Sequence, residues 1–363
     1  MDTHKVVDAA ADASLTGQAQ ILRYIYSALD GMAIRCCVEL RIADIINNHG
    51  RPIALSEIAA GIDCQSINVD GLGRLMRFLV HRKVFDEVVQ AKDGEQEGER
   101  ESVYSLNHCS KWLLSDADST LAPMVMMRTD PFIILPLHVL SRSIKEGVTA
   151  FKIIHGEEKF DFSLISSDFN KVFNQAMACT AKITINAIIS SYKNGFLGSK
   201  GSVVDVGGGI GVAISEIVKA FPHLKGINFD LPHVISTAPS YDGVTHVAGD
   251  MFKAIPPAET IFMKWVLHDW SDDDCIKILK NCLKAIPKDT GKLIIAEVVQ
   301  HPLEDDDPFD DTRLTYDLVM FSHFCDGRER TEFEWKKLLG EAGFSHYNII
   351  KIPALQSIIV AIP

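Results

Sequence analysis

The sequence predicts an α/β protein with a Rossmann-like, doubly wound sheet, preceded by a helical, winged-helix-like N-terminal domain. Three observations lead to this fold class. A buried strand runs through glycines into a helix at residues 203–220, and strand-like and helix-like segments then alternate from 225 to 362. Before residue 107, two helices precede a pair of strands, which is the order of a winged-helix unit.

Composition sets the broad class of the protein. A chain of 363 residues is long enough for two domains with well-buried cores. Its net charge of −12 argues against a nucleic-acid or anionic-membrane partner. The eight cysteines are scattered, with no C-x-x-C motif and no histidines at zinc-ligand spacing, which indicates neither a disulfide framework nor a metal site. No apolar run resembles a signal peptide or a membrane span. We therefore expect a soluble, cytoplasmic protein.

The N-terminal region begins with residues 1–16, which are expected to form a loose tail. Apolar residues recur at helical spacing from Gln18 to Asn47. Ser56 is expected to cap a short helix over Glu57–Ala60, because serine hydroxyls accept bonds from the first helical amides.

A second helix, about Val69–Arg82, and the strands Val84–Val89 and Val103–Leu106 complete the winged unit. This helix and its end carry four basic residues: Arg74, Arg77, Arg82 and Lys83. Such a helix is compatible with DNA binding, but a solvated face on an acidic protein explains the same residues. The acidic remainder of the chain favours the solvated face.

Residues 107–200 are predicted to be mostly helical, with an apolar stripe that includes Phe169, Phe173 and Met177. Such stripes usually pack in a core, although methionines beside aromatic rings also suit a pocket for a flat ligand. The predicted domains are 1–115 and 116–363, the latter with a pocket segment at about 116–200 and an α/β core at about 201–363.

The glycine-rich turn after Val203–Val206 is the predicted cofactor site. Gly207, Gly209 and Gly211 let a ligand approach the backbone at a helix N-terminus. A dinucleotide fingerprint needs a small sixth residue, but Val212 stands there, and no phosphate-binding P-loop is present. A dinucleotide therefore fits this turn poorly.

Polar residues follow the later strands, where ligands bind in doubly wound sheets. The predicted strands are Lys225–Asp230, Val244–Val247, Thr260–Val266, Lys292–Ala296 and an antiparallel pair at about 347–352 and 357–362, with helices at Asp272–Ala285 and Glu332–Ala342. Asp230 ends its strand about two dozen residues past Gly207, where a carboxylate can accept both ribose hydroxyls.

Five ordered motifs carry a family resemblance. They are Val-Asp-Val-Gly-Gly-Gly (204–209), Asn-Phe-Asp-Leu-Pro-His-Val (228–234), Gly-Asp-Met-Phe (249–252), Met-Lys-Trp-Val-Leu-His-Asp-Trp (263–270) and Gly-Arg-Glu-Arg-Thr (327–331). Together they resemble the plant small-molecule O-methyltransferases of the caffeic acid, isoflavone and benzylisoquinoline alkaloid type. The resemblance spans nearly the whole chain. It implies S-adenosylmethionine as cofactor, S-adenosylhomocysteine as product, a small phenolic substrate and a homodimer formed by the N-terminal domain.

The resemblance also assigns site residues. The implied cofactor contacts are Gly207, Gly209, Asp230, Leu231, Asp250, Met251 and Lys264. The implied catalytic base is His268, supported by the carboxylates of Glu297 and Glu329. A phenol has a pKa about 3.5 units above that of an ordinary imidazole, so a histidine base needs a carboxylate that stabilises its imidazolium.

No metal is expected, although the acidic runs Asp272–Asp274 and Glu304–Asp307 raise the possibility of a divalent ion. One run opens a predicted helix and the other lies in a loop bounded by prolines. Both are better explained as solvated faces.

The substrate region departs from the caffeic-acid type. Thr180 replaces a histidine, Phe324 an asparagine and Leu137 a tryptophan, so a free carboxylic acid substrate is disfavoured. We expect a benzylisoquinoline or protoberberine alkaloid phenol, with a lignan, flavonoid or phenylpropenoid phenol as the alternative. The predicted pocket residues are Met127, Asp130, Phe173, Met177, Thr180, Trp265, Asp269, Met320 and Phe324. Asp130 can pair with a cationic amine of the substrate, or it can equally cap a helix that begins at Pro131.

Two other functions remain open at this stage. An NAD-dependent oxidoreductase is disfavoured by Val212. An inactive scaffold protein is disfavoured because His268, Glu297 and Glu329 are all present.

Overall fold

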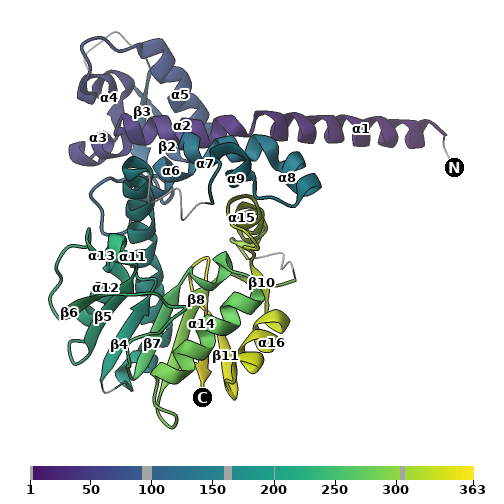
Figure 1. Ribbon diagram of the computed structural model, residues 1–363. Coiled ribbons are helices and arrows are strands. Elements are labelled where there is room, and N and C mark those ends of the chain that lie inside the picture. The colour runs from purple at the N-terminus through teal and green to yellow at the C-terminus, as the bar shows by residue number, and fades with distance from the viewer. Residues whose placement is uncertain (1–2, 92–99, 159–165, 200, 303–306) are drawn as a thin grey trace. The chain divides into compact units, whose positions relative to one another are not determined.

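The computed structural model describes residues 3–91, 100–158, 166–199, 201–302 and 307–363 (Figure 1). The chain separates into two compact units, Met1–Thr129 and Asp130–Pro363. The predicted domain boundary after residue 115 stays a prediction. Among the described residues, no helix combines the length and apolarity that a membrane span requires.

The first unit contains the predicted winged-helix arrangement. Its elements are α1 (Thr3–Tyr26), α2 (Ala28–Glu39), α3 (Ile42–His49), β1 (Ile53–Ala54), α4 (Leu55–Gly61), α5 (Val69–His81), β2 (Phe85–Ala91), β3 (Arg100–Leu106), η1 (Ser110–Leu113) and α6 (Ala122–Arg128). Strands β2 and β3 pair antiparallel, and β1 adds to the other edge of β3. Helix α5 buries Leu72, Met76 and Leu79 at helical spacing, which holds it on the core of the unit.

Two local predictions for the first unit are wrong. Residues 3–16 are helical and continue directly into the rest of α1. This stretch is rich in alanine and has no glycine or proline before Gly17, so helix propensity prevails over its lack of apolar periodicity. Ser56 does not cap α4. The helix starts at Leu55, two residues before the predicted start at Glu57, and Glu57 reaches back to accept the Ala54 amide at 2.9 Å.

Apolar side chains are exposed along the later part of α1 and the start of α2. Leu22, Ile25 and Leu29 are 44%, 62% and 60% exposed. An apolar face of this extent is unusual on an isolated soluble unit. Arg74 and Arg77 on α5 are exposed, whereas Arg82 pairs with Asp30 at 2.6 Å.

The second unit is built on the predicted doubly wound sheet, with strand order β11-β12-β8-β7-β4-β5-β6. The strands of the unit are β4 (Ser202–Val206), β5 (Lys225–Asp230), β6 (Val244–Ala248), β7 (Thr260–Lys264), β8 (Lys292–Glu297), β9 (Val299–Gln300), β10 (Arg330–Thr331), β11 (His346–Lys351) and β12 (Ser357–Ile362). The five adjacent strands β8, β7, β4, β5 and β6 pair in parallel, and β12 pairs antiparallel with both β8 and β11. The predicted sheet and terminal hairpin are confirmed.

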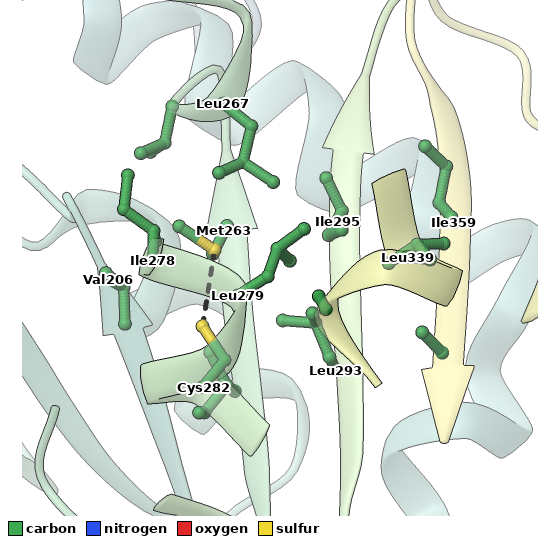
Figure 2. Packing of buried hydrophobic residues seen from close by; sticks show 14 of the residues in the cluster. Val206, Met263, Leu267, Ile278, Leu279, Cys282, Leu293, Ile295, Leu339 and Ile359 are labelled. Carbon is green, nitrogen blue, oxygen red and sulfur yellow. Dashed lines mark hydrogen bonds between the residues drawn. The ribbon is translucent and has the colours of Figure 1, made fainter. Parts of the chain in front are cut away.

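Helices cover both faces of this sheet (Figure 1). The helices and 3₁₀ turns of the unit are α7 (Pro131–Ile134), η2 (Leu135–Val139), α8 (Leu140–Glu146), α9 (Ala150–His155), α11 (Ser167–Leu197), α12 (Val212–Ala220), α13 (Pro232–Ile235), η3 (Leu267–Asp269), α14 (Asp272–Ala285), α15 (Asp310–His323) and α16 (Glu332–Ala342). The side chains of β8 point alternately to the two faces of the sheet. Leu293 and Ile295 pack towards α14 and α16 (Figure 2), and Ile294 packs with the residues of α11 and α12.

The periodicity of the sequence does not predict α15, because its amphipathic pattern is mixed. Its buried positions include Arg313 and Tyr316 as well as Met320, whereas Leu314 and Leu318 are exposed. Apolar residues therefore lie on both faces of this helix and do not mark the inner one.

Candidate active site

The glycine turn forms one wall of the site. Gly207, Gly209 and Gly211 have φ values of +67°, +58° and +87°, which side chains disfavour. A Cβ on Gly207 would lie 2.8 Å from Val266, so this position also needs glycine for space. Asn228 donates to the Gly209 carbonyl at 2.9 Å and holds the turn from below.

The carboxylate of Asp230, at the end of β5, faces this turn. It accepts the Gly209 amide at 2.8 Å and the Leu231 amide at 2.7 Å. Burial raises the pKa of Asp230, and these two hydrogen bonds oppose the shift. The Asp250 carboxylate accepts the Phe252 amide at 2.9 Å and orders the loop after β6.

A cavity of about 410 Å³ lies between the glycine turn, the strand ends and α11. The predicted residues that line it are Gly207, Gly209, Asp230, Leu231, Asp250, Met251, Lys264, Phe173, Met177, Trp265 and Asp269. All the predicted cofactor residues thus meet at one cavity, together with four of the predicted substrate residues. The sequence placed these residues at separate strand ends, and the parallel sheet brings the strand ends together.

Lys264 is a buried cation at the wall of this cavity. Its Nζ donates to Thr180 Oγ1 at 3.1 Å and lies 4.1 Å from the centre of the Trp265 ring. Burial lowers the pKa of Lys264 to about 8, against the attraction of the Glu297 and Asp205 carboxylates. Burial likewise raises the pKa of Asp205 to about 7. Thr180 therefore has a structural contact to Lys264 that the sequence did not indicate.

The imidazole of His268 lies in the 3₁₀ turn η3 and is only 4% exposed. Its Nδ1 lies 2.7 Å from Glu329 Oε1. Burial raises the pKa of Glu329 well above its ordinary value, and the negative charge of Asp317 adds to the shift. We assign the proton of this hydrogen bond to Nδ1, with Glu329 Oε1 as its acceptor, which leaves Nε2 as the basic nitrogen.

Glu297 acts on the backbone of the same turn. Its Oε1 accepts the amides of Val266 at 2.9 Å and Leu267 at 3.0 Å, while its Oε2 lies 3.5 Å from His268 Nδ1. Burial raises the pKa of Glu297, and the nearby Glu329 adds to the shift. Glu329 thus makes the short bond to the imidazole, and Glu297 holds the main chain before it.

Aromatic rings fix the plane of the imidazole. The centroid of the His268 ring lies 6.2 Å from that of Trp265 and 6.0 Å from that of Tyr316, with interplanar angles of 13° and 23°. The Phe324 ring lies 6.4 Å away. Trp265 has a φ of +54°, a strained backbone conformation for a bulky residue.

The other predicted substrate residues lie outside the cavity lining. Met320 and Phe324 are buried at the end of α15, and Asp130 caps α7 by accepting the Phe132 amide at 3.0 Å. Met127 is buried in the first unit. Substrate contact by these residues, and by Thr180, stays a prediction.

Several residues near the site were not predicted. Asn170 and Asn174 line the cavity from α11 and share a hydrogen bond of 3.2 Å. Their spacing of four beside the apolar stripe was a signal that could have identified them. Tyr316 and Asp317 had no such signal, because α15 itself was not predicted.

The chemistry of a metal site is also present here. Ligand atoms of His268, Glu297 and Glu329 lie within 4.8 Å of one another, and a histidine with two carboxylates can bind a divalent ion. Of the two acidic runs, Asp272 pairs with Arg330 and Asp274 with Lys277. The second run lies partly outside the described residues. The expectation of no metal stays a prediction.

Comparison with known proteins identifies the class. Residues 137–345 match the O-methyltransferase domain, and residues 22–116 match the O-methyltransferase dimerisation domain. The fold and these matches define an S-adenosylmethionine-dependent O-methyltransferase. The chain belongs to the plant O-methyltransferase family, so the predicted family and enzyme class are confirmed.

Relatives match over nearly their whole length. The chain is 49% identical to desmethylxanthohumol 6'-O-methyltransferase of Humulus lupulus, covering 96% of this chain and 99% of that protein. It is 46% identical to (R,S)-reticuline 7-O-methyltransferase of Papaver somniferum, covering 97% and 99%. The structure of human N-acetylserotonin methyltransferase in complex with S-adenosylmethionine has the same fold, with a TM-score of 0.80 at 22% identity and coverage of 95% and 97%.

The residues of the cavity fit this cofactor. A Cβ on Gly209 would meet no atom within 4 Å, so the turn leaves open space beside its backbone. Asp230 presents a carboxylate to that space, and Met251 and Phe252 add an apolar wall. A carboxylate suits ribose hydroxyls, and an apolar wall suits an adenine ring.

Proposed function

We propose that this enzyme methylates a phenolic hydroxyl, with His268 as general base and Glu329 as the partner of that base. The observation that carries the proposal is the 2.7 Å hydrogen bond between His268 Nδ1 and Glu329 in a buried environment. Two of the relatives named above support a phenolic acceptor, because their names describe O-methylation of desmethylxanthohumol and of reticuline.

In this proposal the glycine turn and the ends of β5, β6 and β7 hold the cofactor. The Asp230 carboxylate accepts the ribose hydroxyls, Asp250 and Met251 contact the adenine, and Lys264 closes the remaining side. When bound, S-adenosylmethionine supplies an electrophilic methyl group on a positively charged sulfur. The residues of the chain then have to orient the acceptor and take up its proton.

Proton transfer is assigned to His268. With the Nδ1 proton held by Glu329, Nε2 takes the phenolic proton as the oxygen becomes nucleophilic. Nε2 lies 3.5 Å from Oδ1 of Asp269, which lines the cavity. The Glu329 carboxylate stabilises the imidazolium that forms, as in other histidine–carboxylate pairs. Glu297 keeps the turn in place through the amides of Val266 and Leu267.

The surroundings favour transfer to a bound phenol over reaction with water. Phe169, Phe173 and Met177 present apolar surface to the cavity from α11. Displacement at a methyl group needs alignment and a dry site, and these apolar side chains favour the exclusion of water. We propose that no divalent metal takes part, since the proton and the leaving group are both accounted for without one.

The preferred acceptor in this proposal is a benzylisoquinoline or protoberberine alkaloid. Thr180 and Phe324 offer little to a carboxylate, and the 46% identity to a reticuline enzyme supports this class. A flavonoid-type phenol is the second candidate, supported by the 49% identity to the desmethylxanthohumol enzyme.

We also propose that the enzyme is a homodimer in the cytoplasm. The exposed apolar face of α1 and α2 lies largely within the part that matches the dimerisation domain. A second copy would remove this face from water. Light scattering at micromolar concentration should give twice the 40.1 kDa of one chain, and a 40.1 kDa particle would contradict the dimer.

The general-base role predicts the effect of removing the imidazole. His268→Ala should lower kcat by about 10²–10⁴-fold, the usual contribution of a positioned base. S-adenosylhomocysteine binding, measured by calorimetry, should stay nearly unchanged because the imidazole is not among the residues that line the cofactor cavity. Glu297→Gln and Glu329→Gln should each lower kcat by less.

The exposed His346 provides a matched control, and His346→Ala should retain wild-type kcat. A His268→Ala variant that keeps most of its rate at neutral pH would show that the base is another group. The same assays with a chelator should give unchanged rates. Activity that is lost with chelator and restored by magnesium would contradict the metal-free proposal.

The acceptor proposal predicts a ranking of substrates. In a panel of alkaloid, flavonoid, lignan and phenylpropenoid phenols with labelled cofactor, an isoquinoline alkaloid should be methylated fastest and caffeic acid should be poor. Phe324→Ala should change this ranking and leave cofactor affinity unchanged. Fastest turnover of caffeic acid would reject the proposed acceptor, whereas a flavonoid in first place would favour the second candidate.

A further inference from the structure

Arg330 is a buried arginine beside the turn that carries His268. Arg330 is only 1% exposed. Its Nη1 donates to the main-chain carbonyl of Leu267 at 2.9 Å, and its Nη2 donates to that of Trp270 at 2.8 Å. These two carbonyls lie on either side of His268 in the sequence. The guanidinium therefore spans the catalytic turn from one end to the other.

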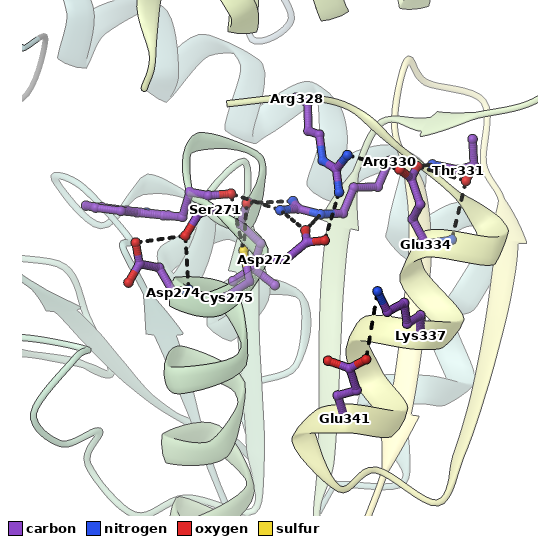
Figure 3. Close-up of polar contacts among 12 residues, drawn as sticks. Ser271, Asp272, Asp274, Cys275, Arg328, Arg330, Thr331, Glu334, Lys337 and Glu341 are labelled. Atoms are coloured by element: carbon purple, nitrogen blue, oxygen red, sulfur yellow. Dashed lines mark hydrogen bonds and ion pairs between the residues drawn. The ribbon is translucent and has the colours of Figure 1, made fainter. Parts of the chain in front are cut away.

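The same guanidinium also bonds the start of the next helix. Nε and Nη2 of Arg330 lie 3.0 Å and 2.9 Å from Asp272 Oδ1, at the first turn of α14 (Figure 3). Arg328 bonds the second oxygen of Asp272 at 2.8 Å. Burial opposes ionisation of Asp272, but the hydrogen bonds from the two arginines outweigh it and lower its pKa. Asp272 is thus an ionised anchor for the fork of Arg330.

Arg330 is also tied to both carboxylates of the site. It directly follows Glu329, and in β10 it pairs with Val299 of β9, two residues beyond Glu297. The backbone amides of the two preceding residues also bond to the site. Arg328 N donates to the His268 carbonyl at 2.9 Å, and Glu329 N donates to Asp317 at 2.8 Å.

We propose that Arg330 is a positioning residue for methyl transfer, which locks the His268 turn against β10 and against Glu329, the residue directly before that strand. The proposal rests on the general-base role of His268. A lysine cannot replace the planar fork, because a single ammonium does not reach two carbonyls and a carboxylate with the same geometry. Among the described residues, Arg330 makes no hydrogen bond to the glycine turn or to Asp230, so its loss should act on the base and not on the cofactor.

The test compares Arg330→Met with Arg330→Lys and with the control Arg328→Met. Arg328 has a side chain that is 43% exposed and bonds the same aspartate, but its guanidinium does not reach the turn. Arg330→Met should lower kcat by about 10²-fold, as a displacement on the order of 1 Å can do. Acceptor KM and S-adenosylhomocysteine affinity should change by less than about threefold. Arg330→Lys should have a kcat about tenfold higher than that of Arg330→Met. Arg328→Met should keep kcat within about threefold of wild type.

A folded Arg330→Met enzyme with wild-type kcat would overturn the proposal. Equal losses of kcat and of S-adenosylhomocysteine binding would also overturn it, because they indicate general structural damage. Should Arg330→Met fail to fold, Asp272→Asn tests the same link from a half-exposed position. It should lower kcat about three- to tenfold at unchanged S-adenosylhomocysteine affinity, and an unchanged kcat would overturn the proposal.

His268→Ala separates this inference from the proposed function. If that variant loses activity while Arg330 variants and Asp272→Asn keep theirs, the base is correct and the positioning role is wrong. If His268→Ala is active, the general-base assignment itself fails.

Discussion

The hydrogen bond between His268 Nδ1 and Glu329 is the interaction on which the rest of the site depends. Both side chains are almost fully buried, so neither can exchange this partner for water without a change in structure. The bond fixes which ring nitrogen carries the proton, and the stacked rings of Trp265 and Tyr316 fix the plane of the ring. Glu297 and Arg330 act one step further out, on the backbone of the turn. The geometry of one hydrogen bond is therefore maintained by groups from β8, β10 and α15.

The site gathers buried ionisable groups at the carboxyl ends of the parallel strands. Asp205, Lys264 and Glu297 all have pKa values displaced by burial, and Asp205 Oδ2 and Glu297 Oε2 have no hydrogen-bond partner in the part of the chain that the structure describes. Such groups lower the stability of a fold, and their clustering beside one cavity is typical of a functional site. The apolar layers on both faces of the sheet stabilise the fold and offset the cost of burying these ionisable groups.

The sequence was sufficient for most elements of the second unit whose signal is local, although two local predictions in the first unit, the tail at 3–16 and the Ser56 cap, were wrong. The β4 turn, the strand over Lys225–Asp230 and the helix over Asp272–Ala285 follow from periodicity, glycine spacing and helix capping. It was insufficient where distant segments decide the structure. The pairing of β9 with β10 joins two-residue strands about 30 positions apart, which no pattern marks. Helix α15 escapes prediction because it buries Arg313 and Tyr316 and exposes leucines, and the contact of Thr180 with Lys264 joins residues 84 positions apart.

The protonation state of the His268 ring tests this account most directly. Nitrogen-15 spectra of histidine-labelled enzyme, with His268 assigned by the loss of its signals in His268→Ala, report which ring nitrogen carries the proton. The account predicts a neutral imidazole with the proton on Nδ1, hydrogen-bonded to Glu329, and a bare Nε2 at pH values where the enzyme is active. A neutral ring protonated on Nε2 would contradict it, because the nitrogen assigned to the acceptor could then not take up a proton.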